Sequence, residues 1–197
     1  MMINTAFMLW RYNIMSRKES VTVENILESA FAIAREDGIS QVTARHVATK
    51  NNCSTQPIFS AFRNMDELWD AVYFKANEFF QDFYEFYPRM SKLPFVNLGM
   101  AYLAFAKSEE KLFRLLFLSD IKKLSMYELL DGKNENVGYE IECAQKAGCE
   151  DAEGLFTEMW MFIHGAACMA LTGDYHLSDV QMMALLERTY NAFVEKM

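Results

Sequence analysis

Three features of the sequence predict an all-α fold. Its 197 residues include only 3 Pro and 8 Gly, too few to separate the many short strands of a β-rich protein. Apolar residues recur at steps of three and four along much of the chain, which is the spacing of amphipathic helices. Residues 43–69 also hold three helix-start signals in close succession.

The first predicted helix covers residues 23–37. Its apolar residues, from Val23 to Ala34, fall on one side of a helix. Thr22 is placed to cap the start, and Gly38 can end the helix in a left-handed conformation that a residue with a Cβ avoids.

The segment TARHVATKNNCSTQPIFSAFRNMDELW predicts two short helices and the start of a long one. We expect Thr43 to cap the first short helix and Ser54 the second, with Pro57 at its third position, where the missing N–H would have no intrahelical partner. Asn64 and Glu67 have capping-box spacing ahead of the long helix. Short helices are marginal alone and must be held by packing. This organisation is a helix-turn-helix, whose second short helix can enter a major groove of DNA.

The rest of the chain also predicts helices. We expect the clearest loop at DGKNENVG, residues 131–138, and a helix after it that ends at Gly148. The other expected helices cover 94–107 with Pro94 in the first turn, a segment opened by Ser108, residues 152–173, and residues 179–197 behind a Ser178/Gln181 capping box. The helix over 152–173 is apolar nearly all round, so we expect it to be buried on more than one side.

Residues 26–72 carry an ordered set of spacings. An alanine-rich helix ends in Gly38, a Thr opens the second helix, a Ser opens the third, and an aromatic residue, a Phe and an acidic-Leu pair follow. In this order the segment resembles the N-terminal domain of the TetR family of bacterial transcription regulators. The resemblance implies a DNA-binding head over residues 1–64 and a ligand-binding and dimerisation body over residues 65–197.

The resemblance implies an interface with a double-stranded DNA operator. Arg45, Thr55 and Gln56 are the expected base readers, and Lys50, Arg63, Arg17 and Lys18 the available phosphate partners. The complete set of expected DNA-binding residues is Thr43, Arg45, Lys50, Ser54, Thr55, Gln56, Pro57, Phe59 and Arg63. Three positions depart from the family pattern: Phe59 replaces a Tyr and Met65 a Lys, which removes two phosphate partners, and Asn52 replaces a turn Gly.

The body is expected to hold a largely apolar small molecule. Aromatic residues and 14 Met suit either a cavity or a core. Both readings stay open for the aromatic stripe at residues 79–86, and His164 is either a ligand contact or a core histidine. The candidate ligand-binding residues are Phe83, Phe105, Phe117, Met126, Trp160 and His164. The resemblance also implies a homodimer formed through residues 152–197.

Other classes of function find little support in the sequence. Four cysteines without a C-x-x-C pair and three scattered histidines predict reduced thiols in a cytoplasm and no metal site or cofactor. Motifs of a nucleophile elbow, a zinc protease or a nucleotide loop are absent, which argues against an enzyme. The sequence contains no apolar run of about 18 residues, so it predicts no membrane-spanning helix. The polar start MSRKES at Met15 suggests that residues 1–14 are an extension.

Charge leaves two functions open. Residues 16–75 hold seven Lys and Arg against eight Asp and Glu, whereas residues 76–197 hold eleven against nineteen. Acid is therefore concentrated away from the expected DNA-binding head, but the head itself is not basic. The first hypothesis is a ligand-responsive transcriptional regulator, usually a repressor, which a small molecule releases from a palindromic operator. The alternative is a small-molecule-binding or protein-interaction module of the same fold that has lost operator binding.

Overall fold

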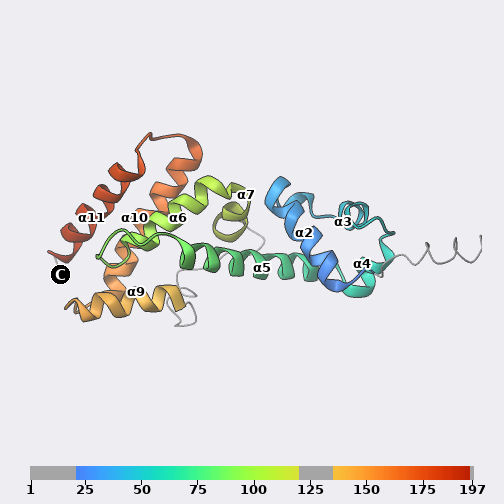
Figure 1. Ribbon diagram of the computed structural model, residues 1–197, viewed down its shortest axis with the longest axis horizontal. Helices are drawn as coiled ribbons and strands as arrows, with labels where there is room; N and C mark the ends of the chain where they lie inside the picture. The colour runs from blue at the N-terminus through green and yellow to red at the C-terminus, as the bar shows by residue number, and fades with distance from the viewer. Residues whose placement is uncertain (1–20, 120–134, 196–197) are drawn as a thin grey trace, which may run out of the picture.

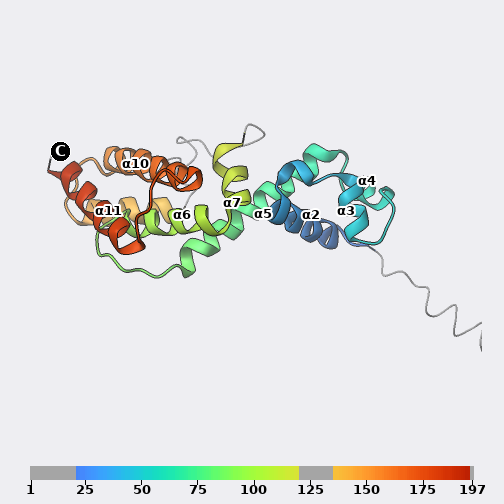
Figure 2. The same cartoon turned by 90° about the horizontal axis from the view of Figure 1, so that it is seen from above.

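The computed structural model describes residues 21–119 and 135–195, which form helices and contain no strand. The head comprises α2 (Val23–Asp37), the 3-10 turn η1 (Ile39–Gln41), α3 (Ala44–Lys50) and α4 (Gln56–Ala61). The long helix α5 (Met65–Phe86) leads to the body, which comprises α6 (Val96–Ser108), α7 (Glu110–Phe113), the π-helical turn η2 (Arg114–Leu118), α9 (Glu135–Lys146), α10 (Ala152–Thr172) and α11 (Asp179–Val194). Head and body lie at opposite ends of an elongated molecule, and α5 runs between them (Figures 1 and 2).

Local capping defines the first helices of the head. The hydroxyl of Thr22 accepts from Asn25 N in a capping box, and Gly38 ends α2 with a φ of 95°. Thr43 caps α3 by accepting from His46 N at 3.2 Å. Asn52, in the turn before α4, takes a φ of 50°, which Asn tolerates better than most residues. The predicted boundaries 23–37 and the caps Thr22 and Thr43 are confirmed.

The start of α4 corrects the sequence prediction. Ser54 does not cap this helix: its N-cap residue is Thr55, in a helical conformation and without a side-chain capping bond. Pro57 is consequently the second helical residue rather than the third. With no side chain accepting at this end, the first N–H groups of α4 stay available to an external acceptor.

Only half of the capping box predicted at α5 forms. Asn64 Oδ1 accepts from Glu67 N at 2.9 Å, as expected. The Glu67 carboxylate instead accepts from Arg63 N at 2.7 Å, one residue before the expected donor. The start of α5 at Met65 is unaffected.

Three predicted boundaries in the body are wrong. Helix α6 begins at Val96 because the buried Phe95 before it adopts a φ of 64°, so Pro94 lies outside the helix. Ser108 is the last residue of α6 and does not open α7. Helix α9 begins at Glu135, inside the predicted loop 131–138, and its end before Gly148 is as expected.

A buried carboxylate attaches α9 to the rest of the body. Glu140 is 2% exposed. Its Oε1 accepts from the Tyr84 hydroxyl at 2.6 Å and lies 3.6 Å from Arg89 Nη1, while Oε2 accepts from Phe95 N at 2.6 Å. One side chain thus joins α9 to the end of α5 and to the start of α6.

At the centre of the body, aromatic rings from several elements pack around Tyr102 of α6. Tyr102 is fully buried, and its ring lies 4.8 Å from those of Phe117 and Trp160. Close packing extends to Gly99, where a Cβ would come within 2.9 Å of the Ile163 side chain on α10. The missing side chain lets α6 and α10 approach closely.

Helix α10 begins at Ala152 as predicted and ends at Thr172, one residue earlier than predicted, with Gly173 as its C-cap. Ser178 and Gln181 form the predicted capping box of α11. By length and composition alone α10 could cross a membrane, as can the core helix of a soluble protein, so it does not contradict the prediction that nothing spans a membrane. Its inner side packs on α6, α9 and α11, and Met161 and Met169 on its outer side are 65% and 47% exposed. Burial within the protomer therefore covers only one side of α10.

Candidate functional site

The short helix α4 lies at the end of the head away from the body (Figure 1). It is anchored from within by Ile58 and Phe62, which are 1% and 7% exposed. Thr55, Gln56 and Phe59 face outward, and Phe59 is 51% exposed. A rigidly backed helix with an exposed N-terminal turn has the shape that major-groove reading requires.

The neighbouring helix α3 contributes to the same end of the molecule. Arg45 is exposed near its start. Thr43 is engaged as a helix cap, and its hydroxyl proton is still available to a phosphate oxygen. Ser54 is exposed and Pro57 half-buried in the turn and first residues of α4. The fold therefore brings the residues predicted to read DNA onto two adjacent short helices.

The predicted phosphate partners in the described part of the chain already have acidic neighbours. Lys50 Nζ lies 3.4 Å from Glu36 Oε2, and Arg63 Nε lies 3.5 Å from Glu67 Oε2. The pKa of Glu67 is lowered, chiefly because its carboxylate accepts from the backbone of Arg63. Both cations are at the surface, where such pairs are weak and a phosphate can compete for them. Arg17 and Lys18 lie outside the described residues.

The predicted ligand-binding residues meet in two groups inside the body. The rings of Phe83 and Phe105 are 5.3 Å apart, and Trp160 lies 6.2 Å from Phe117 and 6.1 Å from His164. Phe105 is fully buried and Phe117 is 7% exposed, so these two rings belong to the aromatic core. Met126 lies outside the described residues. Sequence periodicity did not single out Tyr102, which contacts both Trp160 and Phe117, because its role depends on long-range packing.

His164 is bonded within this core. Its Nδ1 lies 2.8 Å from the Tyr102 hydroxyl, and burial lowers the pKa of its imidazole. The ring is half-buried rather than enclosed. The expectation of a satisfied core histidine is met by this hydrogen bond, and a ligand contact stays a prediction.

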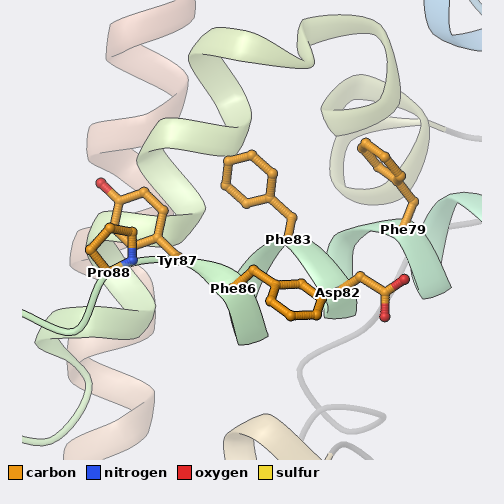
Figure 3. Close-up of a pocket in the computed structure, with 6 residues that line it drawn as sticks. All are labelled: Phe79, Asp82, Phe83, Phe86, Tyr87 and Pro88. Atoms are coloured by element: carbon orange, nitrogen blue, oxygen red, sulfur yellow. The ribbon is translucent and has the colours of Figure 1, made fainter.

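An aromatic pocket of about 350 Å³ opens along the second half of α5. Figure 3 shows Phe79 and Phe83 projecting from one side of the helix, with Asp82 and Phe86 at the front and Tyr87 and Pro88 at the end. Phe83 is the predicted ligand residue that lines it. The stripe at residues 79–86 therefore divides: Phe80 and Tyr84 are core, while the other aromatic rings border the pocket.

Phe79 links this pocket to the head. Its ring lies 5.8 Å from that of Phe31 on α2 and 4.7 Å below the guanidinium carbon of Arg35. Arg35 Nε donates to Glu109 Oε2 at 2.7 Å, and its Nη2 donates to Oε1, between α6 and α7. Sequence reasoning missed this fork because the partners are 74 residues apart. The contact connects the head to both the pocket wall and the body.

A second, strongly apolar groove of about 430 Å³ lies between α10 and α11. It is lined by Met161, Phe162, Gly165, Ala166, Met169, Tyr175, Leu177, Met182 and Leu185. The Tyr175 hydroxyl oxygen is buried here without a hydrogen-bond partner among the described residues. An exposed apolar groove of this kind is typical of a surface that another molecule covers.

Comparison with known proteins places these features in a family. Residues 95–193 match the tetracyclin repressor-like C-terminal domain. Among curated proteins none matches the chain. A TetR-family transcriptional regulator from Haemophilus influenzae is 18% identical, with a TM-score of 0.60 over 86% of this chain and 94% of that one. A TetR-like regulator from Rhodococcus is 14% identical, with a TM-score of 0.62 over 90% and 98%. The multidrug binding protein EbrR, solved with imidazole, is 17% identical, with a TM-score of 0.53 over 88% and 92%.

The solved structures support the all-α arrangement of a helix-turn-helix head and a helical body, and the domain match covers half of the sequence. The chain belongs to the TetR family of transcription regulators.

Proposed function

We propose that this regulator binds a palindromic operator as a homodimer and leaves it when a small molecule binds the body. The observation that carries the proposal is α4, a short helix anchored by Ile58 and Phe62 with Thr55, Gln56 and Phe59 directed outward. Two copies of α4 would occupy half-sites about 34 Å apart, one turn of DNA. Such a protein works in the cytoplasm and catalyses no reaction.

The dimer is proposed to form through residues 152–197. The exposed apolar side of α10 and the groove it shares with α11 supply the surface, and a partner subunit would cover Met161 and Met169.

The ligand is proposed to be largely apolar and to enter the pocket along α5. Aromatic walls and a volume of about 350 Å³ suit a small organic molecule. Displacement of Phe79 would reach the head directly through Phe31 and Arg35. A ligand that favours one head orientation shifts the dimer away from the spacing that fits the operator.

The decisive experiment is a salt titration of binding to DNA from upstream of the protein's own gene. Arg45→Ala should weaken operator binding by about 1 to 3 kcal/mol and relax the preference at one base pair. Lys18→Ala should weaken binding to all sequences alike and reduce the salt dependence, because phosphate contacts carry no sequence information. Unchanged affinity and base preference for Arg45→Ala would refute this recognition scheme.

A second candidate function is a ligand-binding or interaction module of this fold without an operator. Phe59 and Met65 favour it, since they stand where the family pattern has a Tyr and a Lys that could contact phosphates, and the head has no net positive charge. This candidate predicts no retardation of the upstream DNA even at low salt, together with a rise in melting temperature when an apolar ligand is added.

A further inference from the structure

Three reactive side chains lie in line where α6 faces α10. The Tyr102 hydroxyl is 2.8 Å from His164 Nδ1, and His164 Nε2 is 3.7 Å from Cys168 Sγ. Tyr102 is fully buried, whereas His164 and Cys168 are half-buried. A thiol next to an imidazole whose other nitrogen is hydrogen-bonded has the arrangement of an activated nucleophile, its base and an orienting group.

The imidazole is held in place by its neighbours. Its ring lies 6.1 Å from that of Trp160 and 6.4 Å from that of Phe113, with interplanar angles of 21° in both cases. Burial lowers the pKa of His164, so at neutral pH the ring is uncharged and can accept a proton. After that transfer, the imidazolium Nδ1–H can donate to the Tyr102 oxygen.

We propose that Cys168 is a nucleophilic modification site for α,β-unsaturated carbonyl compounds, with His164 as proton acceptor and Tyr102 as the residue that orients the imidazole. The Cys168 thiol proton passes to His164 Nε2, and the sulfur electron pair forms a C–S bond with the β-carbon. The C=C π pair moves to the carbonyl as an enolate, which takes a proton at the α-carbon from the imidazolium. The product is a thioether, and no leaving group or oxidant is needed.

The other cysteines provide internal controls. Cys53, Cys143 and Cys149 are half-buried, like Cys168. Cys143 is hydrogen-bonded to Tyr139, and within the described residues Cys168 is the cysteine with an imidazole as its partner. These cysteines are half-buried like Cys168 but have no imidazole beside them among the described residues. Comparing their reaction rates with that of Cys168 therefore separates the effect of His164 from the effect of solvent exposure.

The experiment follows the alkylation of all four cysteines in the intact protein with acrylamide as the electrophile. The folded protein first reacts with ordinary acrylamide for a set time. The reaction is then quenched, and the cysteines that have not reacted are labelled with isotopically heavy acrylamide after denaturation. Peptide mass spectrometry gives the fraction of each cysteine that carries the light label. We expect Cys168 to react at least about tenfold faster than Cys53 and Cys149 at pH 7. A Cys168 rate equal to or below that of Cys53 overturns the proposal.

Two variants test the partners. His164→Gln keeps a polar side chain but removes the base, so Cys168 should slow about tenfold. Tyr102→Phe keeps the buried ring and should produce a smaller loss. Unchanged rates at Cys53 and Cys149 in the same samples show that the fold is intact. An unchanged Cys168 rate in His164→Gln overturns the role of His164. The reaction requires no DNA, so its outcome is separate from that of the operator experiment.

Discussion

In the head, short helices are begun and ended by residues that lie within a few positions of them, whereas in the body the decisive contacts join residues far apart in the sequence. Thr22 and Thr43 cap helices through N–H groups three residues away. Glu140, by contrast, reaches Tyr84 across 56 residues and Phe95 across 45. The head can therefore present polar side chains outward, while the body depends on burial and on a few polar groups that are satisfied from a distance.

The largest expected effect tests that dependence in the body. Glu140→Ala should lower the free energy of unfolding by about 3 to 5 kcal/mol, because it leaves the buried Tyr84 hydroxyl and Phe95 N–H without their acceptor. Glu142→Ala on the same helix is the control. It removes an exposed pair with Lys146 and should leave the free energy of unfolding nearly unchanged. Urea unfolding measures both, and equal losses would contradict the assigned role of Glu140.

The second prediction concerns the outer side of α10. Gly165→Glu places a charge in the apolar groove, where a Cβ meets no atom within 4 Å in the protomer. We expect a folded protein whose dimerisation is weakened about a hundredfold or more, since burying an unpaired charge costs several kcal/mol. Analytical ultracentrifugation gives the association state.

The matched control for this interface is Gly138→Glu on α9, where the Cβ position is also open. It should associate like the wild type. Ala167→Glu is a poorer probe because Ala167 is fully buried within the protomer, so its substitution unfolds the chain whether or not a dimer forms. Equal association of the two glycine variants would exclude α10 from the interface.

The third prediction is loss of stability in alkali, again from the body. Burial raises the pKa of Tyr84 and Tyr102 above the ordinary value of 10.0. Unfolded tyrosine therefore releases its proton first, the folded state holds more protons, and stability decreases as pH rises beyond 10. Each tyrosine should contribute about 1.4 kcal/mol per pH unit until its folded pKa is reached. The midpoint urea concentration of unfolding should fall as the pH rises from 9 to 11, and it should fall less steeply in Tyr84→Phe. An equal dependence on pH in the wild type and this variant would contradict the role given to Tyr84.

The smallest expected effect lies in the head. Phe59→Tyr adds a hydroxyl to an exposed ring on α4 and should strengthen operator binding by about 0.5 to 1 kcal/mol through one hydrogen bond to a phosphate. The salt dependence should not change, because the hydroxyl carries no charge. Phe86→Tyr, at an 82% exposed position on α5, is the control and should leave affinity unaltered. Weaker binding by Phe59→Tyr would show that this ring makes an apolar contact instead.

The same contrast explains what the sequence could predict. Caps and turns are local signals, so the helices of the head and the capping box at Ser178 were predictable to within a residue or two. The prediction that Ser54 caps α4 was wrong because the chain already has a helical conformation at Thr55, and no side chain caps this helix. The prediction that Pro94 lies in the first turn of α6 was wrong because the buried Phe95 takes a positive φ just before the helix. No local sequence pattern indicates that positive φ.

The candidate sites divide along the same line. Thr55, Gln56 and Phe59 were named from the resemblance and from the predicted start of the helix, and the structure places all three exposed on or next to α4. Their contact with DNA stays a prediction. For the body, sequence reasoning named aromatic residues but could not separate Phe83, at the pocket, from the fully buried Phe105. Arg35 was missed because its partner Glu109 comes from another element, 74 residues away. The His164–Cys168 contact is an i, i+4 pair on α10, so its spacing could have been noticed in the sequence.

The Arg35–Glu109 fork has a consequence for building chimeric regulators. Exchanging heads at the junction before α5 would transplant Arg35 and Phe31 away from Glu109 and Phe79, which stay with the body. A foreign head would then be tethered by α5 without the side contact that fixes its orientation. Head exchange in this scaffold should therefore succeed only with donors that supply an arginine and an aromatic ring at these two positions of α2.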